Sequence, residues 1–235
     1  MTPGRPRDSA SGERIYGRRP VAEAEAAGRR RILRTWSAPE TPDAELERLA
    51  GSPDHQGIVC EVGPYPYADP NALLKPADGP QGSPGGVLLA LDEVQDPRNL
   101  GAIARSAEVA GAAGLIICER RAASVTAACC KTSAGAVEHL PIARVTNLAD
   151  WLAQAKQAGY WVWGADAAAP GSHTETDLTG PLVLVLGGEA KGLRPRVADA
   201  CDGLLSIPVR GRIESLNVSA AASVLLFEAQ RQRTA

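Results

Sequence analysis

The amino-acid sequence predicts an α/β domain built on a parallel sheet between Gly85 and Ala235. From Gly85 onward, short apolar runs alternate with longer helical patterns, which is typical of a parallel sheet covered by helices on both faces. With 235 residues, 44% of them hydrophobic, the chain can bury one substantial core and a small second module. Pro and Gly recur between Gly63 and Gly86 and predict a linker between the two parts.

The first 62 residues divide into a tail and a small module. Residues 1–12 are rich in Pro, Gly, Ser and Arg, and we expect this tail to be disordered. Residues 13–62 are expected to form the module, with helices from Val21 to Leu33 and from Asp43 to Ala50, and a strand from Ile58 to Val62. Residues 63–84 then form the linker.

The main domain, residues 85–235, is expected to alternate strands and helices in a regular order. Strands are predicted at residues 87–91, 114–118, 140–143, 160–164, 182–186 and 204–207. Helices are predicted at residues 99–110, 123–130, 147–158, 193–199 and 215–231. Ligands of open parallel sheets bind at the carboxyl ends of the strands, so the loops that follow these strands are the expected place for a site.

The charge of the chain is segregated. A net charge of −2 argues against a protein that binds nucleic acid through bulk positive charge. Residues 1–36 nevertheless carry nine arginines, at positions 5, 7, 14, 18, 19, 29, 30, 31 and 34, against the four acids Asp8, Glu13, Glu23 and Glu25. An Arg-rich start beside an acidic remainder suits a local contact with nucleic acid, and it equally suits a solubilising tail.

The cysteines and histidines indicate neither disulfides nor a metal site. Five cysteines form an odd set without a C-x-x-C pair, which fits small buried thiols in a reducing compartment. Neither His55 nor His139 has a metal-ligand partner three or four residues away. No apolar run has the length of a signal peptide or a bilayer span, so we expect a cytoplasmic protein without a membrane partner.

The loop after the first strand of the main domain contains Asp96-Pro97-Arg98-Asn99, which predicts a turn. Asn99 is then placed to cap a helix whose apolar stripe is Leu100, Ile103, Ala104 and Ala107. Arg105 lies off that stripe, where an arginine is most often only a solvated side chain.

The loop after the strand at 182–186 is rich in glycine. Gly187 and Gly192 have the G-x4-G spacing of a phosphate-binding loop, but Leu193 and Arg194 follow where Lys and Ser or Thr are needed. No G-x-G-x-x-G follows the first strand, which speaks against a dinucleotide fold. A pair of glycines at the end of a strand lets backbone approach a ligand closely, and a tight turn alone would also need them.

The most informative segment runs from Leu205 to Ser219, where a hydrophobic strand opens into a polar loop and then enters an Ala-rich helix. This order of strand, polar loop and helix predicts a binding loop that carries Ser215, Leu216, Asn217 and Ser219. Ser and Asn at the start of a helix are also ordinary caps, so the loop alone leaves both interpretations open.

Taken in this order, the three loops resemble the motifs of the SpoU/TrmH family of RNA 2′-O-ribose methyltransferases, within the SPOUT superfamily. Asn99, Arg105 and Ala107 match the N-x5-R-x-A pattern of the first motif. Ile207-Pro208 and Ser215-Leu216-Asn217-Val218-Ser219 match the third. Ile15-Tyr16-Gly17, His55-Gln56-Gly57 and residues 135–139 make the chain most similar to the bacterial enzymes that methylate a guanosine of 23S ribosomal RNA.

The resemblance implies S-adenosyl-L-methionine as cofactor, held in a deep C-terminal trefoil knot, and a homodimer that acts on RNA and not on DNA. It implies cofactor contacts at Gly187, Ile207 and Leu216. It places Arg105 at the ribose 2′-hydroxyl as the catalytic residue, with Glu189 accepting hydrogen bonds that brace the site. Asn99, Ser215 and Asn217 complete the expected catalytic set, with Ser215 and Asn217 positioning the substrate and Arg105.

Two further expectations concern the ends of the chain. The module at 13–62 is shorter than in the family, with a helix and a strand missing between Trp36 and Leu46, so we expect it to fold only partly or by docking. Near the C-terminus, an apolar helix stripe of Ala221, Val224, Leu225 and Ala229 suits either a dimer interface or packing within one subunit.

Two alternatives to a ribosomal RNA enzyme remain. A transfer RNA ribose methyltransferase of the same family shares all three motifs. A relative that binds RNA or S-adenosylmethionine without turnover would also fit the fold, although the presence of Arg105, Glu189, Ser215 and Asn217 favours catalysis.

Overall fold

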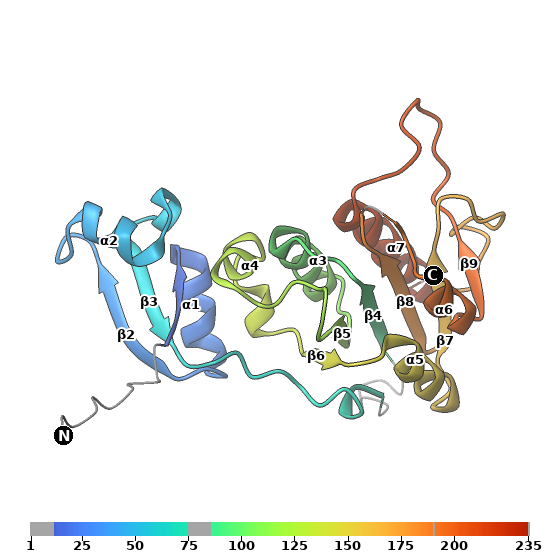
Figure 1. Cartoon of the computed structure of the whole chain (residues 1–235), viewed down its shortest axis with the longest axis horizontal. Helices are drawn as coiled ribbons and strands as arrows, with labels where there is room; N and C mark the ends of the chain where they lie inside the picture. Colours follow the sequence, from blue (N-terminus) through green and yellow to red (C-terminus); the bar gives the residue numbers. More distant parts are fainter. Residues whose placement is uncertain (1–11, 75–85, 190, 235) are drawn as a thin grey trace, which may run out of the picture.

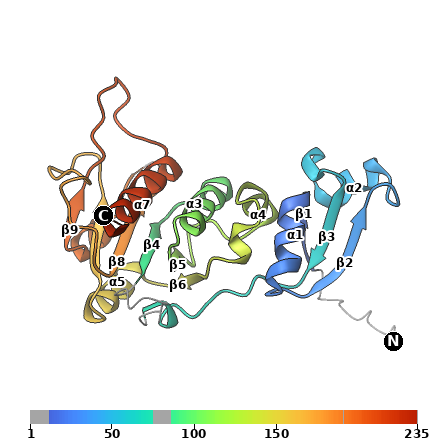
Figure 2. The same cartoon turned by 180° about the vertical axis from the view of Figure 1, so that it is seen from behind.

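The structure is a computed structural model that describes residues 12–74, 86–189 and 191–234. The predicted disordered tail, apart from Gly12, and residues 75–84 of the predicted linker lie outside the described residues. The views from two sides place a small N-terminal module at one end of the molecule and the C-terminal helix toward the other (Figures 1 and 2).

The main domain confirms the predicted parallel α/β fold. Its six strands all pair in parallel, in the spatial order β6-β5-β4-β8-β7-β9. These strands are β4 (Val87–Asp92), β5 (Gly114–Cys118), β6 (Ile142–Val145), β7 (Trp161–Ala165), β8 (Leu182–Gly187) and β9 (Gly203–Leu205). The α-helices between and after them are α3 (Pro97–Val109), α4 (Ala127–Thr132), α5 (Leu148–Gln157), α6 (Pro195–Ala200) and α7 (Val218–Thr234).

Alternation along the strands builds two cores, one on each face of this sheet. Leu89 and Leu91 of β4 share one buried cluster with side chains of α3 and α7, whereas Leu88 and Ala90 share another with those of α5 and α6. Successive side chains of a strand point to opposite faces, so a strand that is buried along its whole length must be covered on both. The sheet is thereby held rigid, and its carboxyl edge can support loops.

Several predicted boundaries move for local reasons. Helix α3 begins at Pro97 because the Asp96 carboxylate accepts a hydrogen bond from the Arg98 backbone N–H and acts as the cap. Strand β6 begins only at Ile142, after Pro141, and α4 begins only after the Thr126 cap. Helix α7 begins at Val218, so Ser215 lies in the loop and not in the predicted helix.

The N-terminal module contains more structure than the sequence predicts. A three-stranded antiparallel sheet, in the order β1-β3-β2, is packed against one helix on each face. Its elements are β1 (Glu13–Tyr16), α1 (Arg18–Ala27), β2 (Ile32–Ser37), α2 (Asp43–Ala50), the 3-10 turn at Pro53–His55 and β3 (Ile58–Val62). The expectation of a partly folded module is therefore wrong.

The predicted helix from Val21 to Leu33 is also wrong in extent. Gly28 adopts the left-handed conformation with φ 62° and ends α1, so Leu33 belongs to strand β2. The predicted helix at Asp43–Ala50 and the strand at Ile58–Val62 are confirmed. Beyond the module, residues 63–74 include one 3-10 turn at Ala72–Leu74.

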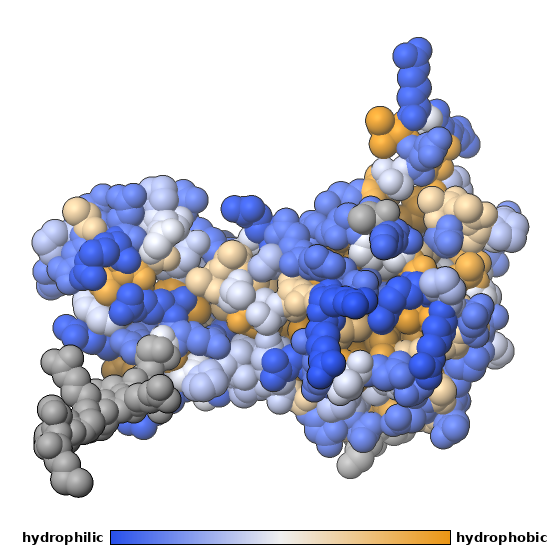
Figure 3. Space-filling view, in the orientation of Figure 1, coloured by the Kyte–Doolittle hydropathy of each residue, from blue (hydrophilic) through white to orange (hydrophobic). Residues whose placement is uncertain are grey.

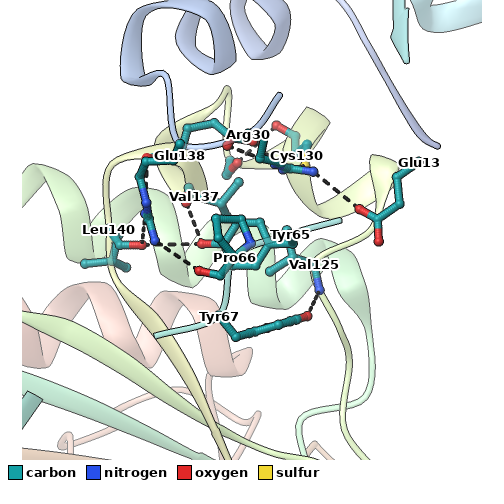
Figure 4. A network of polar contacts seen from close by, with 12 residues as sticks. Glu13, Arg30, Tyr65, Pro66, Tyr67, Val125, Cys130, Val137, Glu138 and Leu140 are labelled. Atoms are coloured by element: carbon teal, nitrogen blue, oxygen red, sulfur yellow. Dashed lines mark hydrogen bonds and ion pairs between the residues drawn. The ribbon is translucent and has the colours of Figure 1, made fainter. Parts of the chain in front are cut away.

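The module is docked on the main domain through a shared core and a buried ion pair. Ile15, Val21 and Val62 belong to the same apolar cluster as Val125 and Val137 of the main domain. At its edge, Arg30 is 4% exposed and pairs with Glu138, which is 1% exposed (Figure 4). Arg30 also donates to the Cys130 sulfur at 3.2 Å and lies over the ring of Tyr65.

Further contacts close this junction around the ion pair. Arg29 donates hydrogen bonds to the backbone oxygens of Glu138, Leu140 and Pro66, and the Tyr65 hydroxyl donates to the Val137 oxygen at 2.6 Å (Figure 4). Burial alone would lower the pKa of Arg30, but the hydrogen bond and charge of Glu138 raise it above its usual value. Arg30 therefore stays charged in the interior, where removal of Glu138 would leave it without a counter-charge.

Replacing Glu138 by Gln keeps the shape of the side chain and removes its charge. We expect Glu138→Gln to lower the free energy of unfolding by about 3–5 kcal/mol, because a buried guanidinium loses its counter-charge. The matched control is Glu45→Gln, which removes the carboxylate of an exposed ion pair with Arg48 in the module. It should change the free energy of unfolding by less than about 0.5 kcal/mol. Urea denaturation of both variants measures the difference, and equal midpoints would contradict the role of the buried pair.

Candidate active site at the carboxyl edge of the sheet

Three loops at the carboxyl edge of the sheet are joined by one chain of hydrogen bonds. The Asn99 amide nitrogen donates to the Glu189 carboxylate, and the Asn217 amide nitrogen donates to the Asn99 side-chain oxygen at 3.2 Å. The Asn217 side-chain oxygen in turn accepts from the backbone N–H and hydroxyl of Ser219, at 2.9 and 2.6 Å. The structure thus brings together Asn99, Glu189 and Asn217, which come from three separate motifs.

The position of Asn99 corrects one prediction. Asn99 does not cap α3, because Asp96 does so and Asn99 already lies in the first turn of the helix. Its side chain is therefore available to bridge Glu189 and Asn217. Asn217, by contrast, acts as an ordinary cap of α7 through its contact with the Ser219 N–H and also takes part in the site.

The glycines of the second motif allow the loop after β8 to lie directly against its neighbours. A Cβ on Gly187 would overlap the backbone of Gly192, and a Cβ on Gly188 would lie 2.6 Å from the Glu93 oxygen. Gly192 itself has a φ of 63°, which favours glycine. The tight-turn interpretation and the close-approach interpretation of these glycines therefore both apply. We call residues 187–189 and 191–194 the glycine loop.

An ion pair that the sequence does not reveal, between a buried carboxylate and a partly exposed guanidinium, holds the glycine loop in place. Asp92 at the end of β4 is fully buried and accepts hydrogen bonds from the backbone N–H and Nε of Arg194, at 2.8 and 2.7 Å. The Asp92 backbone oxygen also accepts from the Gly188 N–H at 2.8 Å. The hydrogen bond from Arg194 to Asp92 raises the pKa of Arg194, and this pairing fastens the loop at both ends.

A cavity of about 510 Å³ opens between the glycine loop and the loop after β9. Gly187, Ile207 and Leu216, the three predicted cofactor contacts, all line it. Its apolar wall includes Leu186 and Leu205, and its polar groups include Asp166, Glu189, Ser215 and Asn217. Cavities of this size with mixed walls are typical of sites for small organic ligands.

The loop at residues 206–217 projects from the body of the molecule between β9 and α7 (Figure 1). In the space-filling view its outer end is hydrophilic and apolar residues lie nearer the body (Figure 3). Val209, Ile213 and Leu216 in this loop are 44%, 76% and 45% exposed. Ser215 lines the cavity and is exposed, so the structure places it at the mouth of the site.

Arg105 is not in hydrogen-bond contact with the other predicted site residues. It lies on α3 with an exposed side chain, and the described residues provide it with no hydrogen bond or ion pair. On the same face of α3, Val109 is 61% exposed. Helix α7 packs beside α3, with the hydroxyls of Ser106 and Ser223 2.7 Å apart, and presents Val224 and Phe227 at 37% and 45% exposure. We call Arg105, Val109, Val224 and Phe227 the α3–α7 surface.

The predicted apolar stripe on the last helix is divided between two roles. Leu225 and Ala229 are fully buried against the main domain, so they pack within the subunit, whereas Val224 belongs to the α3–α7 surface. The described part of the chain contains no group of three His, Cys, Asp or Glu side chains arranged to hold a metal ion. Within the same residues, no helix has the length and apolar character needed to span a bilayer.

The fold and the site define an α/β domain with a ligand cavity built from the loops after β8 and β9. The chain belongs to the SpoU rRNA Methylase family, whose model matches residues 86–227. It is 48% identical over 194 residues to an uncharacterized tRNA/rRNA methyltransferase of Mycobacterium avium, a match that covers 83% of this chain. It spans about 62% of the length of that relative. It is also 43% identical over 192 residues to YacO of Bacillus subtilis, which carries a TrmH-family tRNA/rRNA methyltransferase name; this match covers 82% of this chain and 76% of YacO.

Solved structures show the same fold over nearly the whole chain. The SpoU methyltransferase AviRb from Streptomyces viridochromogenes, in complex with the cofactor AdoMet, superposes with a TM-score of 0.74 at 27% identity. That match covers 97% of this chain and 92% of AviRb. An AdoMet-bound rRNA methyltransferase from Sinorhizobium meliloti superposes with a TM-score of 0.81 at 27% identity, over 96% of this chain and 89% of the other.

The Asp92–Arg194 pair should control how often the glycine loop opens. We expect Asp92→Asn to accelerate tryptic cleavage after Lys191 at least tenfold, because the loop loses its charged anchor and proteolysis follows the open population. Cleavage after Arg194 is blocked by Pro195, so Lys191 reports on the loop specifically.

The matched control is Arg196→Ala, which breaks the exposed Arg196–Asp150 pair on neighbouring α6. Its cleavage rate, followed by mass spectrometry, should equal that of the unmodified chain. Equal rates in Asp92→Asn and Arg196→Ala would contradict the anchoring role of Asp92.

Proposed function

We propose that the chain is an S-adenosylmethionine-dependent RNA methyltransferase that modifies the 2′-oxygen of a ribose, and that its substrate is a guanosine of 23S ribosomal RNA. The observation that carries the proposal is the hydrogen-bond chain from Glu189 through Asn99 to Asn217, at the rim of a cavity lined by Gly187, Ile207 and Leu216. The three family motifs thereby form one site.

The residues of the cavity fit the cofactor. Gly187 lines the cavity and lets the turn close, because a Cβ there would overlap the Gly192 backbone, and Ile207 and Leu216 offer apolar contacts to an aromatic ring. Asp166 and Glu189 add carboxylates that can accept hydrogen bonds from hydroxyl or ammonium groups. When bound, S-adenosylmethionine supplies an electrophilic methyl group. The trefoil knot implied by the family resemblance remains part of this proposal.

The chain must activate a ribose hydroxyl, which is a very weak acid. Methyl transfer to the 2′-oxygen releases the hydroxyl proton, so the site has to stabilise negative charge developing on that oxygen. Arg105 is assigned this role because a guanidinium is permanently charged, and the proton then passes to water or to a phosphate. Glu189, Asn99 and Asn217 hold one another in place, and Ser215 at the mouth of the cavity can contact the substrate.

The position of Arg105 supports a homodimer. Arg105 is exposed on α3, which packs against α7, and these two helices carry three exposed apolar side chains that a second copy would cover. A symmetric interface places each Arg105 near the partner, so the active site would be completed across the two-fold axis. The five free cysteines, four of them buried, fit the expected cytoplasmic location.

Two other functions remain open to test. The relatives from Mycobacterium avium and Bacillus subtilis carry names that include both tRNA and rRNA, so transfer RNA is the second candidate substrate. A relative that binds S-adenosylmethionine or RNA without turnover is the third, and the intact Glu189–Asn99–Asn217 chain argues against it.

Transfer of a labelled methyl group to transcribed 23S ribosomal RNA and to transfer RNA tests the proposal. One phosphodiester of the product should resist alkaline cleavage, because the 2′-hydroxyl that attacks the adjacent phosphate is blocked. Arg105→Ala should reduce the rate by about 10²–10³ while S-adenosylmethionine affinity stays within a few-fold. Arg231→Ala, which removes an exposed guanidinium far along α7, is the control and should retain the rate. Label on a base, or Arg105→Ala at full rate, would refute the proposal.

The proposed dimer is tested by placing a charge on the α3–α7 surface. We expect the unmodified chain to sediment as a dimer at micromolar concentration and Phe227→Glu to sediment as a monomer, because a carboxylate would be buried without a partner. Trp161→Glu is the matched control, since Trp161 is 58% exposed on β7, outside that surface. A monomeric, active unmodified chain would overturn the dimer.

A further inference from the structure

A second cavity lies on the other side of the glycine loop from the proposed cofactor site. It encloses about 380 Å³ and is lined by Glu93 and Gln95 after β4, by Arg121 after β5, and by Lys191 and Arg194 of the glycine loop. Gly188, Glu189, Lys191 and Gly192 line both cavities, so the glycine loop is the partition between them. We call the second cavity the β4–β8 crevice.

The strand order gives this crevice a special position in the sheet. From β4 the chain proceeds outward to β5 and β6, and it then crosses to the opposite side of β4 to form β7, β8 and β9. The direction of winding therefore changes between β4 and β8. Ligands of open α/β sheets bind outside the carboxyl ends of the strands at such a switch point. The proposed cofactor cavity lies instead toward β7 and β9, which leaves the switch point for another ligand.

The backbone of the crevice is strained at two positions. Glu93 and Arg121 have φ values of 57° and 56°, in the left-handed region that non-glycine residues rarely adopt. Such residues persist where the surrounding structure enforces them, commonly at ligand sites. The loops that carry them are tied together by the hydrogen bond from the Ala123 N–H to the Val94 oxygen at 2.8 Å.

The charges of the crevice favour an anion at its mouth. Arg194 is already paired with Asp92 and with Glu93, the latter at 3.2 Å, and Glu189 accepts from Asn99. Arg121 is 77% exposed and reaches Glu93 only at 3.8 Å, and Lys191 forms no ion pair with the described residues. Two cationic side chains from different loops thus flank one opening and can bind one phosphate together.

We propose that the β4–β8 crevice binds a phosphate of the substrate RNA next to the target ribose, through Arg121 and Lys191. The inference rests on the proposed function, because Glu189 lines both cavities and would place the ribose at their common wall. A phosphodiester adjoins every ribose in a strand, so a nucleic acid whose ribose meets Glu189 and Asn99 has a phosphate within reach of the crevice. One cavity then holds the cofactor, and the other holds the RNA strand.

The double variant Arg121→Ala/Lys191→Ala tests this assignment with whichever transcript, 23S ribosomal RNA or transfer RNA, the unmodified chain methylates. We expect KM for that RNA to rise at least tenfold and the slope of log Kd against log salt to decrease by about 0.7, the value for one lost phosphate contact on a single strand. The value of kcat at saturating RNA should stay within about twofold, since neither side chain is assigned to chemistry. Because Lys191 also lines the proposed cofactor cavity, S-adenosylmethionine affinity is compared in the single variant Arg121→Ala, which should bind the cofactor within about twofold of the unmodified chain.

The control is Arg196→Ala/Arg231→Ala, which removes the same charge from exposed positions outside the crevice. The single variant Arg121→Lys, which keeps Lys191, should retain most of the RNA affinity, because it keeps the positive charge at position 121. Equal losses of RNA affinity in the two double variants, or an unchanged salt slope in Arg121→Ala/Lys191→Ala, would overturn the crevice assignment. The proposed function would still stand if the unmodified chain methylated the RNA. If the unmodified chain binds RNA but methylates none, the proposed function fails, and the binding and salt data still decide the crevice.

Discussion

The carboxyl edge of the sheet depends on one steric constraint, the close approach of the glycine loop to the end of β4. Gly187 and Gly188 lack the side chains that would strike Gly192 and Glu93, so the loop can lie flat against its neighbours. The buried Asp92 then fastens it through Arg194. This position brings Glu189 within reach of Asn99, 90 residues away in the sequence, and separates the proposed cofactor cavity from the β4–β8 crevice.

A second constraint orients the N-terminal module. The Arg30–Glu138 pair lies in a desolvated junction and is surrounded by an apolar cluster common to both parts. Buried pairs are costly to desolvate and are weak evidence for net stability, but they tolerate few geometries. We therefore interpret the pair as the contact that sets the angle of the module and holds its exposed arginines in a fixed relation to the carboxyl edge of the sheet.

The sequence predicted the parallel sheet and the three loops because alternating apolar runs locate strands, and loops after strands share one edge. The cavity-lining residues Gly187, Ile207 and Leu216 were predicted only from the resemblance to the SpoU/TrmH family. It missed β1 and β2 because these strands are short and rich in exposed charge, so the Arg- and Glu-rich segment around them resembles a helix. It assigned the cap of α3 to Asn99, although Asp96 before Pro97 is the stronger signal. The Asp92–Arg194 pair joins residues 102 positions apart, and no local pattern could have revealed it.

Hydrogen exchange with and without S-adenosylmethionine tests most directly whether the cavity between the glycine loop and the β9–α7 loop is the cofactor site. The cofactor should protect backbone amides in residues 186–194 and 205–218, where its proposed contacts Gly187, Ile207 and Leu216 lie. Amides of the N-terminal module should exchange at the same rate in both samples. Protection confined to other segments, or no protection at saturating cofactor, would contradict the assignment of this cavity.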